Sequence, residues 1–106
     1  MSTADAYAQL AWILATSPRA ELRDGRESIE LAKQAVQLKN MKDAFSFDAL
    51  AAACAEAGDF TDAVQYADRA TKLAKALGYE KYSRDIQKRL KLYIRRQPFR
   101  TKSESG

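Results

Sequence analysis

The sequence predicts an all-α fold in which two helical hairpins are followed by a further helix. Apolar and small residues recur three and four positions apart along most of the chain, which is the spacing of one helix face. No stretch sustains the alternation of a strand, and only two prolines and four glycines interrupt the 106 residues. One pattern also occurs twice, at an offset of about 40 residues that suits a helical repeat.

The first hairpin is expected to lie upstream of residue 41. Either Ser2 or Thr3 can cap the start of its first helix, and Pro18 disfavours helix at the residue before it. Asp24 suits the N-cap of the second helix, and Asn40 suits its end. These signals place one helix before Pro18 and another after Asp24.

The second hairpin shows the repeat more plainly. Its first helix is expected to open near Asp43 and to stop at Gly58, and its second to open at Asp59 or Thr61 and to close at Gly78. The expected core stripe is Tyr7, Leu10, Ala11, Leu14, Ser28, Ala32, Ala35 and Leu38 in the first copy and Phe47, Leu50, Ala51, Cys54, Ala63, Ala67, Ala70 and Leu73 in the second. Such a hairpin cannot bury its own apolar face, so the two copies must stack.

A last helix is expected from about residue 80 to residue 96, with Pro98 as a stop signal. One of its faces carries Tyr82, Ile86, Leu90 and Tyr93. With no partner helix after it, this helix takes the position of a cap on the second hairpin. We therefore divide the chain into a helical domain, residues 1–97, and a tail, residues 98–106, which is mostly polar and is expected to be disordered.

Several positions match one helical-repeat family. The matches are Phe47, Leu50, Gly58, Phe60, Ala63 and Ala70. In this respect the chain resembles a pair of tetratricopeptide repeats (TPRs), although Ala51, Cys54 and Lys75 stand where the family prefers glycine, tyrosine and proline. The resemblance implies a fragment of a right-handed α-solenoid whose leading helices line a concave face. The segment around Trp12 is also similar to divergent repeats near the C-terminal ends of larger bacterial proteins, so the chain is either standalone or part of a larger protein.

The residues that enzymes use are sparse. The chain has no histidine, the side chain best suited to proton transfer near neutral pH and the commonest metal ligand. Its single cysteine, Cys54, lies on the core stripe, and the carboxylates are scattered over helix surfaces and caps. We expect no enzymatic activity, no metal and no cofactor.

The compartment is inferred from what the sequence does not contain. The longest apolar run, residues 10–15, is far short of the roughly 20 residues that cross a bilayer. No positive region precedes it, and a single cysteine cannot form an internal disulfide. A cytoplasmic protein without a membrane partner is expected.

Trp12, Phe45 and Asp48 are candidate partner-binding residues on the face that the resemblance makes concave. The Lys, Asn and Arg residues with which one TPR subfamily clamps a peptide carboxylate are absent, because Ala8, Trp12, Asp48 and Ala52 stand there. Trp12 lies outside the core stripe, and two interpretations stay open. It packs under the first loop or against the helix that opens near Asp43, or it is an aromatic anchor for a partner or for a second copy of the chain.

Positive charge gathers late in the chain. Residues 79–106 hold nine Lys or Arg against three Asp or Glu, whereas the first 78 residues hold nine against eleven. Lys81, Arg84, Lys88, Lys91 and Arg95 fall within roughly an 80° sector of the last helix, opposite its apolar stripe. This sector is either the solvated outer face of a cap or a surface that attracts an acidic partner. Asp85 and Arg89 are expected to pair at four-residue spacing.

The leading hypothesis is a non-enzymatic scaffolding module that binds a peptide or helix of a partner protein, steered by the basic sector. Self-association into a homo-oligomer is a further expectation, since repeat arrays usually need about three repeats for stability. Two alternatives stay open. One is a nucleic-acid accessory protein that uses the basic helix, which is disfavoured because no base-reading motif is present. The other is a structural tail domain of a larger protein.

Overall fold

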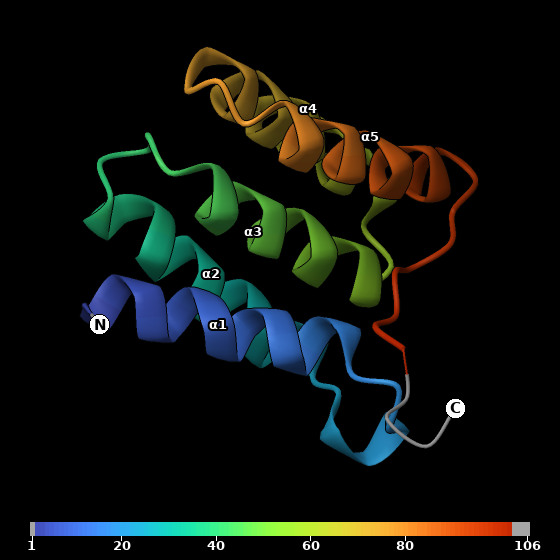
Figure 1. The fold of residues 1–106 in the computed structure, drawn as a ribbon. Coiled ribbons are helices and arrows are strands. Elements are labelled where there is room, and N and C mark those ends of the chain that lie inside the picture. Colours follow the sequence, from blue (N-terminus) through green and yellow to red (C-terminus); the bar gives the residue numbers. More distant parts are fainter. Residues whose placement is uncertain (1, 103–106) are drawn as a thin grey trace.

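The computed structural model describes residues 2–102 and confirms the all-α prediction (Figure 1). Its elements are α1 (Thr3–Thr16), the short 3₁₀ turn η1 (Ala20–Leu22), α2 (Gly25–Leu38), α3 (Ala44–Glu56), α4 (Phe60–Ala76) and α5 (Glu80–Ile94), with no strand in this part of the chain. Consecutive helices run antiparallel, so α1 and α2 form one hairpin and α3 and α4 a second, and α5 packs against α4. None of these helices combines the length and the apolar character needed to cross a bilayer.

Short polar side chains cap four of the five helices at their N-termini. Ser2, Asp24, Asp43 and Asp59 each accept a hydrogen bond of 3.0–3.1 Å from the backbone N–H three residues further on. The caps of α1 and α4 are therefore Ser2 and Asp59, which decides between the alternatives that the sequence left open. α5 begins after Tyr79 without a side-chain cap.

Left-handed residues end the helices where the sequence placed its stop signals. Gly58 and Gly78 have φ angles of +88° and +81°, a conformation that costs glycine little. After α2 the same region is occupied by Asn40 and Met41, at 55° and 60°. Each of these turns reverses the chain within a few residues, so successive helices lie side by side.

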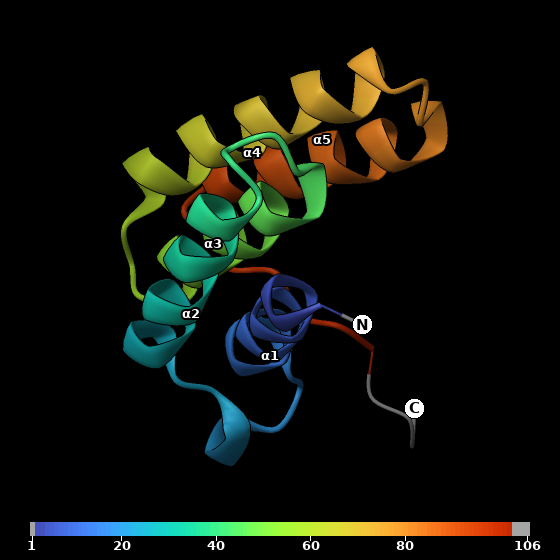
Figure 2. The same ribbon diagram turned by 90° about the vertical axis from the view of Figure 1, so that its left-hand side faces the viewer.

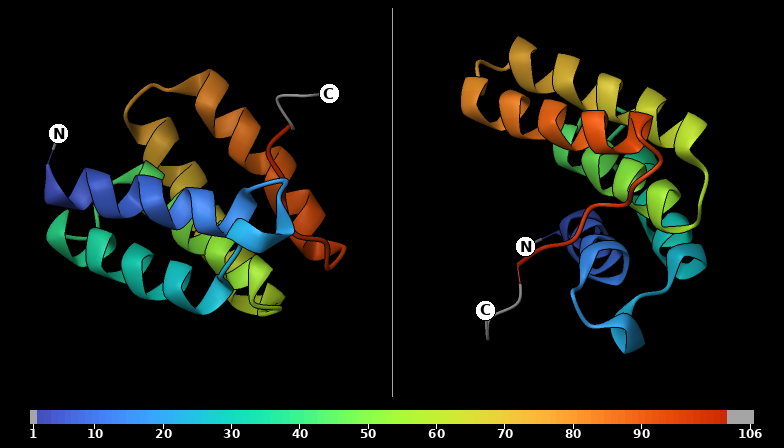
Figure 3. Two further views of the ribbon diagram at one scale, coloured as in Figure 1. Left: turned by 90° about the horizontal axis from the view of Figure 1, so that it is seen from below. Right: turned by 90° about the vertical axis from the view of Figure 1, so that its right-hand side faces the viewer.

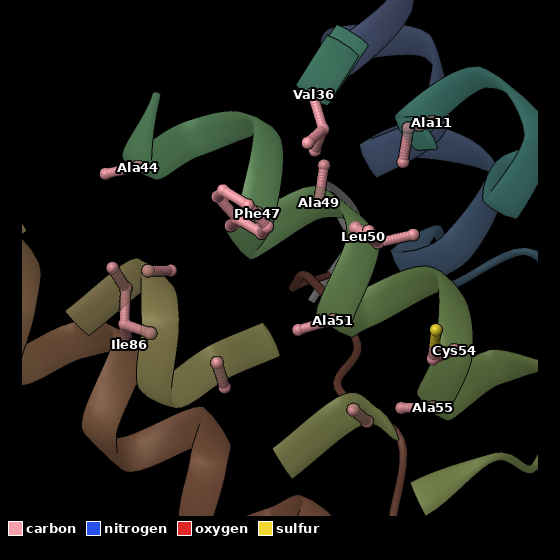
Figure 4. Close-up of a cluster of buried hydrophobic side chains, with 14 of the residues drawn as sticks. Ala11, Val36, Ala44, Phe47, Ala49, Leu50, Ala51, Cys54, Ala55 and Ile86 are labelled. Carbon is pink, nitrogen blue, oxygen red and sulfur yellow. The ribbon is translucent and has the colours of Figure 1, made fainter. Parts of the chain in front are cut away.

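α3 is the centre of the molecule. It packs on α1, α2 and α4, and all residues from 46 to 55 are buried. In Figure 4, Val36 of α2 faces Ala49 of α3, while Phe47 and Leu50 extend from other faces of the same helix. Because helices approach α3 from several sides, most of its positions accept only alanine-sized side chains.

The predicted core stripe of α1 is wrong in part. The residues of α1 that the structure buries are mostly alanines, namely Ala4, Ala8, Ala11 and Ala15. Leu10, expected in the core, is 46% exposed, and Leu38 of α2 is 57% exposed. Ser28 shows the reason, since its Oγ donates a 2.6 Å hydrogen bond to the carbonyl oxygen of Ala11. The two helices are too close for leucine at that contact.

The helices form two sides around α3. Figure 2 shows α1 and α2 on one side of α3, and α4 and α5 on the other. After α5 ends, Arg96 adopts a φ of 59° and the chain turns back (Figure 3). Residues 98–101 then contact α5, α3 and α1 in turn and reach the C-terminal end of α1.

This path corrects the prediction of a disordered tail for residues 98–102. That prediction weighed the polar composition of the segment and gave no weight to Phe99. In the structure Phe99 packs against the core cluster, and Arg100 and Thr101 bind to α1 and α3. The same prediction for residues 103–106 lies outside the described residues.

Candidate functional site

The candidate site is the surface on which residues 98–101 lie. We call it the inner surface and define it by Trp12, Ala15 and Thr16 of α1, Phe45, Asp48 and Glu56 of α3, and Arg89 of α5. Three helices far apart in the sequence thus contribute to it. Its contacts with residues 98–101 are of three kinds, aromatic, ionic and main-chain.

Phe99 supplies the aromatic contact. Its ring centroid lies 5.7 Å from that of Trp12, which in turn lies 6.0 Å from that of Phe45. The guanidinium carbon of Arg89 is 5.1 Å from the centroid of the Trp12 ring and 5.3 Å from that of the Phe99 ring, so one cation contacts both aromatic rings. Phe99 therefore completes a cluster whose other members belong to three helices.

Asp48 holds Arg89 in this position. The Asp48 carboxylate, 1% exposed, accepts hydrogen bonds from Arg89 Nη2 at 2.7 Å, from Arg89 Nε at 3.3 Å and from the Tyr82 hydroxyl at 2.8 Å. Burial raises the pKa of the Asp48 carboxyl, and the interactions with Arg89 and Tyr82 oppose that rise. The sequence predicted that Asp48 contacts a partner. In the structure it is buried and instead orients Arg89.

Glu56 supplies the ionic contact. Its Oε1 lies 2.6 Å from Nη2 of Arg100, and its Oε2 lies 3.4 Å from Nε of Arg23. Glu56 is the last residue of α3, where the helix dipole disfavours a negative charge. Two arginines offset that unfavourable position, and one of them comes from residues 98–101.

The C-terminal end of α1 supplies the main-chain contact. The last carbonyls of a helix have no partner within the helix. Here the Thr16 carbonyl accepts hydrogen bonds from the backbone N–H of Thr101 at 2.9 Å and from its hydroxyl at 3.2 Å. The Ala15 carbonyl accepts one from Arg100 Nη1 at 3.3 Å. The inner surface thus presents acceptors at one end and aromatic rings at the other.

The structure divides the predicted site residues into two groups. Trp12 and Phe45 are half-buried on the inner surface, together with the buried Asp48. The others, Lys81, Arg84, Lys88, Lys91 and Arg95, are exposed on the outer face of α5, opposite the buried Ile86 and Tyr93. Trp12 packs against α3 through Phe45, as one interpretation predicted, and also against Phe99, which neither interpretation included.

The ion pairs of α5 differ from those expected. Arg89 pairs with Asp48 instead of Asp85, and Asp85 Oδ2 lies 3.3 Å from Lys81 Nζ. A carboxylate therefore borders one end of the basic sector. Arg89 was missed as a site residue because it was assigned to a local pair; the signal that could have found it is its place outside that sector.

The described residues do not bring three or more metal-ligating side chains together at any point. The thiol of Cys54 is buried in α3, and burial, with Asp59 and Asp62 nearby, raises its pKa to about 12. What the inner surface offers is therefore non-covalent contact through rings, a carboxylate and carbonyl oxygens. Comparisons with protein-family models, curated proteins and solved structures found no match for this chain.

Proposed function

We propose that the chain is a non-enzymatic interaction module that binds a non-helical peptide of a partner protein on the inner surface. One observation supports this most directly: residues 98–101 lie there outside any helix, held through the ring of Phe99, the guanidinium of Arg100 and the backbone N–H of Thr101. Peptide recognition commonly combines a side-chain pocket or platform with main-chain hydrogen bonds. The inner surface offers both to a segment of any origin.

The proposed architecture is TPR-like. In its support, Ala63, Ala67 and Ala70 are fully buried in α4, and the turn between α3 and α4 is made by Gly58 in the left-handed region. The inner surface draws its residues from α1 and α3, the leading helices of the two proposed repeats, and from α5, which follows them in the same order. The arrangement suits a two-repeat module with a cap.

The exposed basic residues on the outer face of α5 favour a partner protein with an acidic surface. Arg84, Lys88, Lys91 and Arg95 are exposed there, well separated from the buried side of the helix. Such charges act over a screening length of about 8 Å at physiological salt, so they speed encounter more than they hold a complex. In this proposal the inner surface binds the peptide and the outer face of α5 attracts the body of the partner.

The test is selection of random peptides displayed on phage against the full chain and, in parallel, against its Trp12→Ala variant. Peptides that bind the inner surface should be enriched on the full chain and should lose binding to Trp12→Ala. Leu10→Ala, an exposed change two residues away, is the matched control and should leave binding unchanged. Enrichment of only those peptides that bind all three chains equally would contradict the proposal.

A further inference from the structure

We propose that residues 98–101 act as an internal ligand of the inner surface, and that partners of this surface carry an aromatic residue followed directly by arginine. A partner then binds by displacing residues 98–101. This inference rests on the proposed function, because it assigns the ligand chemistry and the regulation of the same surface. It is carried by the contacts of Phe99, Arg100 and Thr101.

The first position of the ligand is aromatic because of the way Arg89 is held. Asp48 binds the guanidinium through two of its nitrogens, at 2.7 and 3.3 Å, so its charge is already paired. The guanidinium also contacts the rings of Trp12 and Phe99. A planar ring fits between these groups, whereas a second carboxylate would compete with Asp48 for the same donors.

The second position is cationic because the groups around it are acceptors. Arg100 Nη2 meets Glu56 at 2.6 Å, and its Nη1 meets the carbonyl oxygens of Ala15 and Phe99. Arginine serves these acceptors through its several N–H groups, which lysine cannot do in the same geometry. An acidic residue here would face Glu56 and the negative end of the α1 dipole.

The third position contributes its backbone. The N–H of Thr101 donates to the Thr16 carbonyl at 2.9 Å, a contact that any residue except proline can make. The Thr101 hydroxyl adds a 3.2 Å hydrogen bond to the same oxygen, which favours a hydroxyl residue. The sequence chemistry of the ligand is therefore aromatic, arginine, then serine or threonine.

Residues 98–101 compete with a partner because they are tethered to the surface they occupy. A short tether gives a segment an effective concentration in the millimolar range. If the segment is docked in about 99% of molecules, the apparent dissociation constant of a partner rises about 100-fold. Weakening the segment without removing it should therefore reveal the affinity of the surface.

Trp12, the only tryptophan, lies against Phe99, so its fluorescence reports what occupies the surface. The experiment titrates a capped peptide of residues 97–102 into the full chain and into the double variant Phe99→Ala, Arg100→Ala. The double variant should bind the peptide at least 10-fold more tightly than the unaltered chain. The control variant Gln97→Ala, Lys102→Ala changes two exposed flanking residues and should behave as the unaltered chain.

Peptide variants test the ligand chemistry. On the double variant, a Phe99→Ala peptide should not bind measurably, and an Arg100→Glu peptide should bind at least 10-fold more weakly than the original. Equal binding of the peptide by the double variant and the unaltered chain would overturn the inference, as would equal binding of the Arg100→Glu peptide. Should the double variant lose its helical circular dichroism, the single variant Arg100→Glu, which leaves Phe99 in place, gives the same comparison.

The outcome is separable from that of the peptide selection. Trp12-dependent peptides that lack the aromatic–arginine pair, together with a peptide of residues 97–102 that fails to bind, would overturn this inference and leave the proposed function standing. If neither the unaltered chain nor the double variant selects any Trp12-dependent peptide, both fall.

Discussion

Tyr82 and Tyr93 are two tyrosines of α5 with different hydrogen bonding. The Tyr82 hydroxyl donates to the Asp48 carboxylate at 2.8 Å, whereas the buried Tyr93 hydroxyl contacts no hydrogen-bond partner among the described residues. We expect Tyr82→Phe to lower the free energy of unfolding by about 1.5–3 kcal/mol, because it removes a hydrogen bond to a charged group. Tyr93→Phe should leave the free energy of unfolding unchanged or raise it, because it removes a buried hydroxyl that makes no hydrogen bond to the described residues.

Urea denaturation of both variants measures this difference. They share the same chemical change on the same helix, so each is the control for the other. Equal losses would show that the bond between Tyr82 and Asp48 carries no special stability, and that Arg89 alone holds the buried carboxylate.

Cys54 offers a second test at this scale. Burial keeps its thiol protonated, with a pKa raised to about 12, well above the ordinary value of about 8.5. Since the thiolate is the reactive form, a disulfide reagent at pH 8 should modify the folded chain very slowly and the urea-unfolded chain at the rate of a free thiol. Fast modification of the folded chain would show that the thiol is accessible and that this part of α3 opens readily.

Alanine allows the helices to pack closely against one another. Ala70 of α4 is fully buried, while Ala76 at the end of the same helix is exposed. We expect Ala70→Leu to lower the free energy of unfolding by about 1–3 kcal/mol, because three added carbons must displace packed neighbours. Ala76→Leu adds the same atoms at no such cost. If the denaturation midpoints of the two variants agree, Ala70 does not lie at a close helix contact.

Helix limits were predictable because the signals that set them are local. A capping side chain binds an N–H three residues away, and a left-handed glycine acts on its own turn, so Asp24, Asp43 and Gly58 could be placed from the sequence. Which face of α1 is buried was less predictable. Leucine is the more apolar residue, but the distance between helices decides what fits, and alanine occupies the contact.

The inner surface was only partly predictable because its contacts join distant residues. Asp48 and Arg89 lie 41 positions apart, and the four-residue spacing of Asp85 and Arg89 suggested a nearer partner. Phe99 stands in a polar segment whose composition predicts no structure. Its isolation as an aromatic residue was the one available signal, and it has meaning only once Trp12 and Arg89 are in place.

At the scale of the whole molecule, the exposed basic residues on the outer face of α5 are separate from the residues that form the inner surface. Reversal of two basic residues on the outer face, Lys88→Glu with Lys91→Glu, should slow association about 10-fold at low salt for a selected peptide that carries an acidic flank. Lys33→Glu with Lys75→Glu changes the net charge equally on α2 and α4 and is the matched control. Surface plasmon resonance at several salt concentrations measures the rates.

Unchanged rates would show that the outer face of α5 is simply a solvated face of the cap. Binding of unrelated oligonucleotides with a steep salt dependence, lost on the same reversals, would instead favour the nucleic-acid alternative.

The hydrogen bonds between Thr16 and Thr101 span 85 positions, almost the whole chain. Closing so long a loop carries an entropic cost that is recovered only after α1, α3 and α5 are assembled, because each contributes to the surface that receives residues 98–101. Docking of this segment should therefore be the last event of folding. In stopped-flow refolding, helical circular dichroism should reach its final value before the emission of Trp12 does. The interval between the two signals is the time for which a newly folded chain presents its surface open.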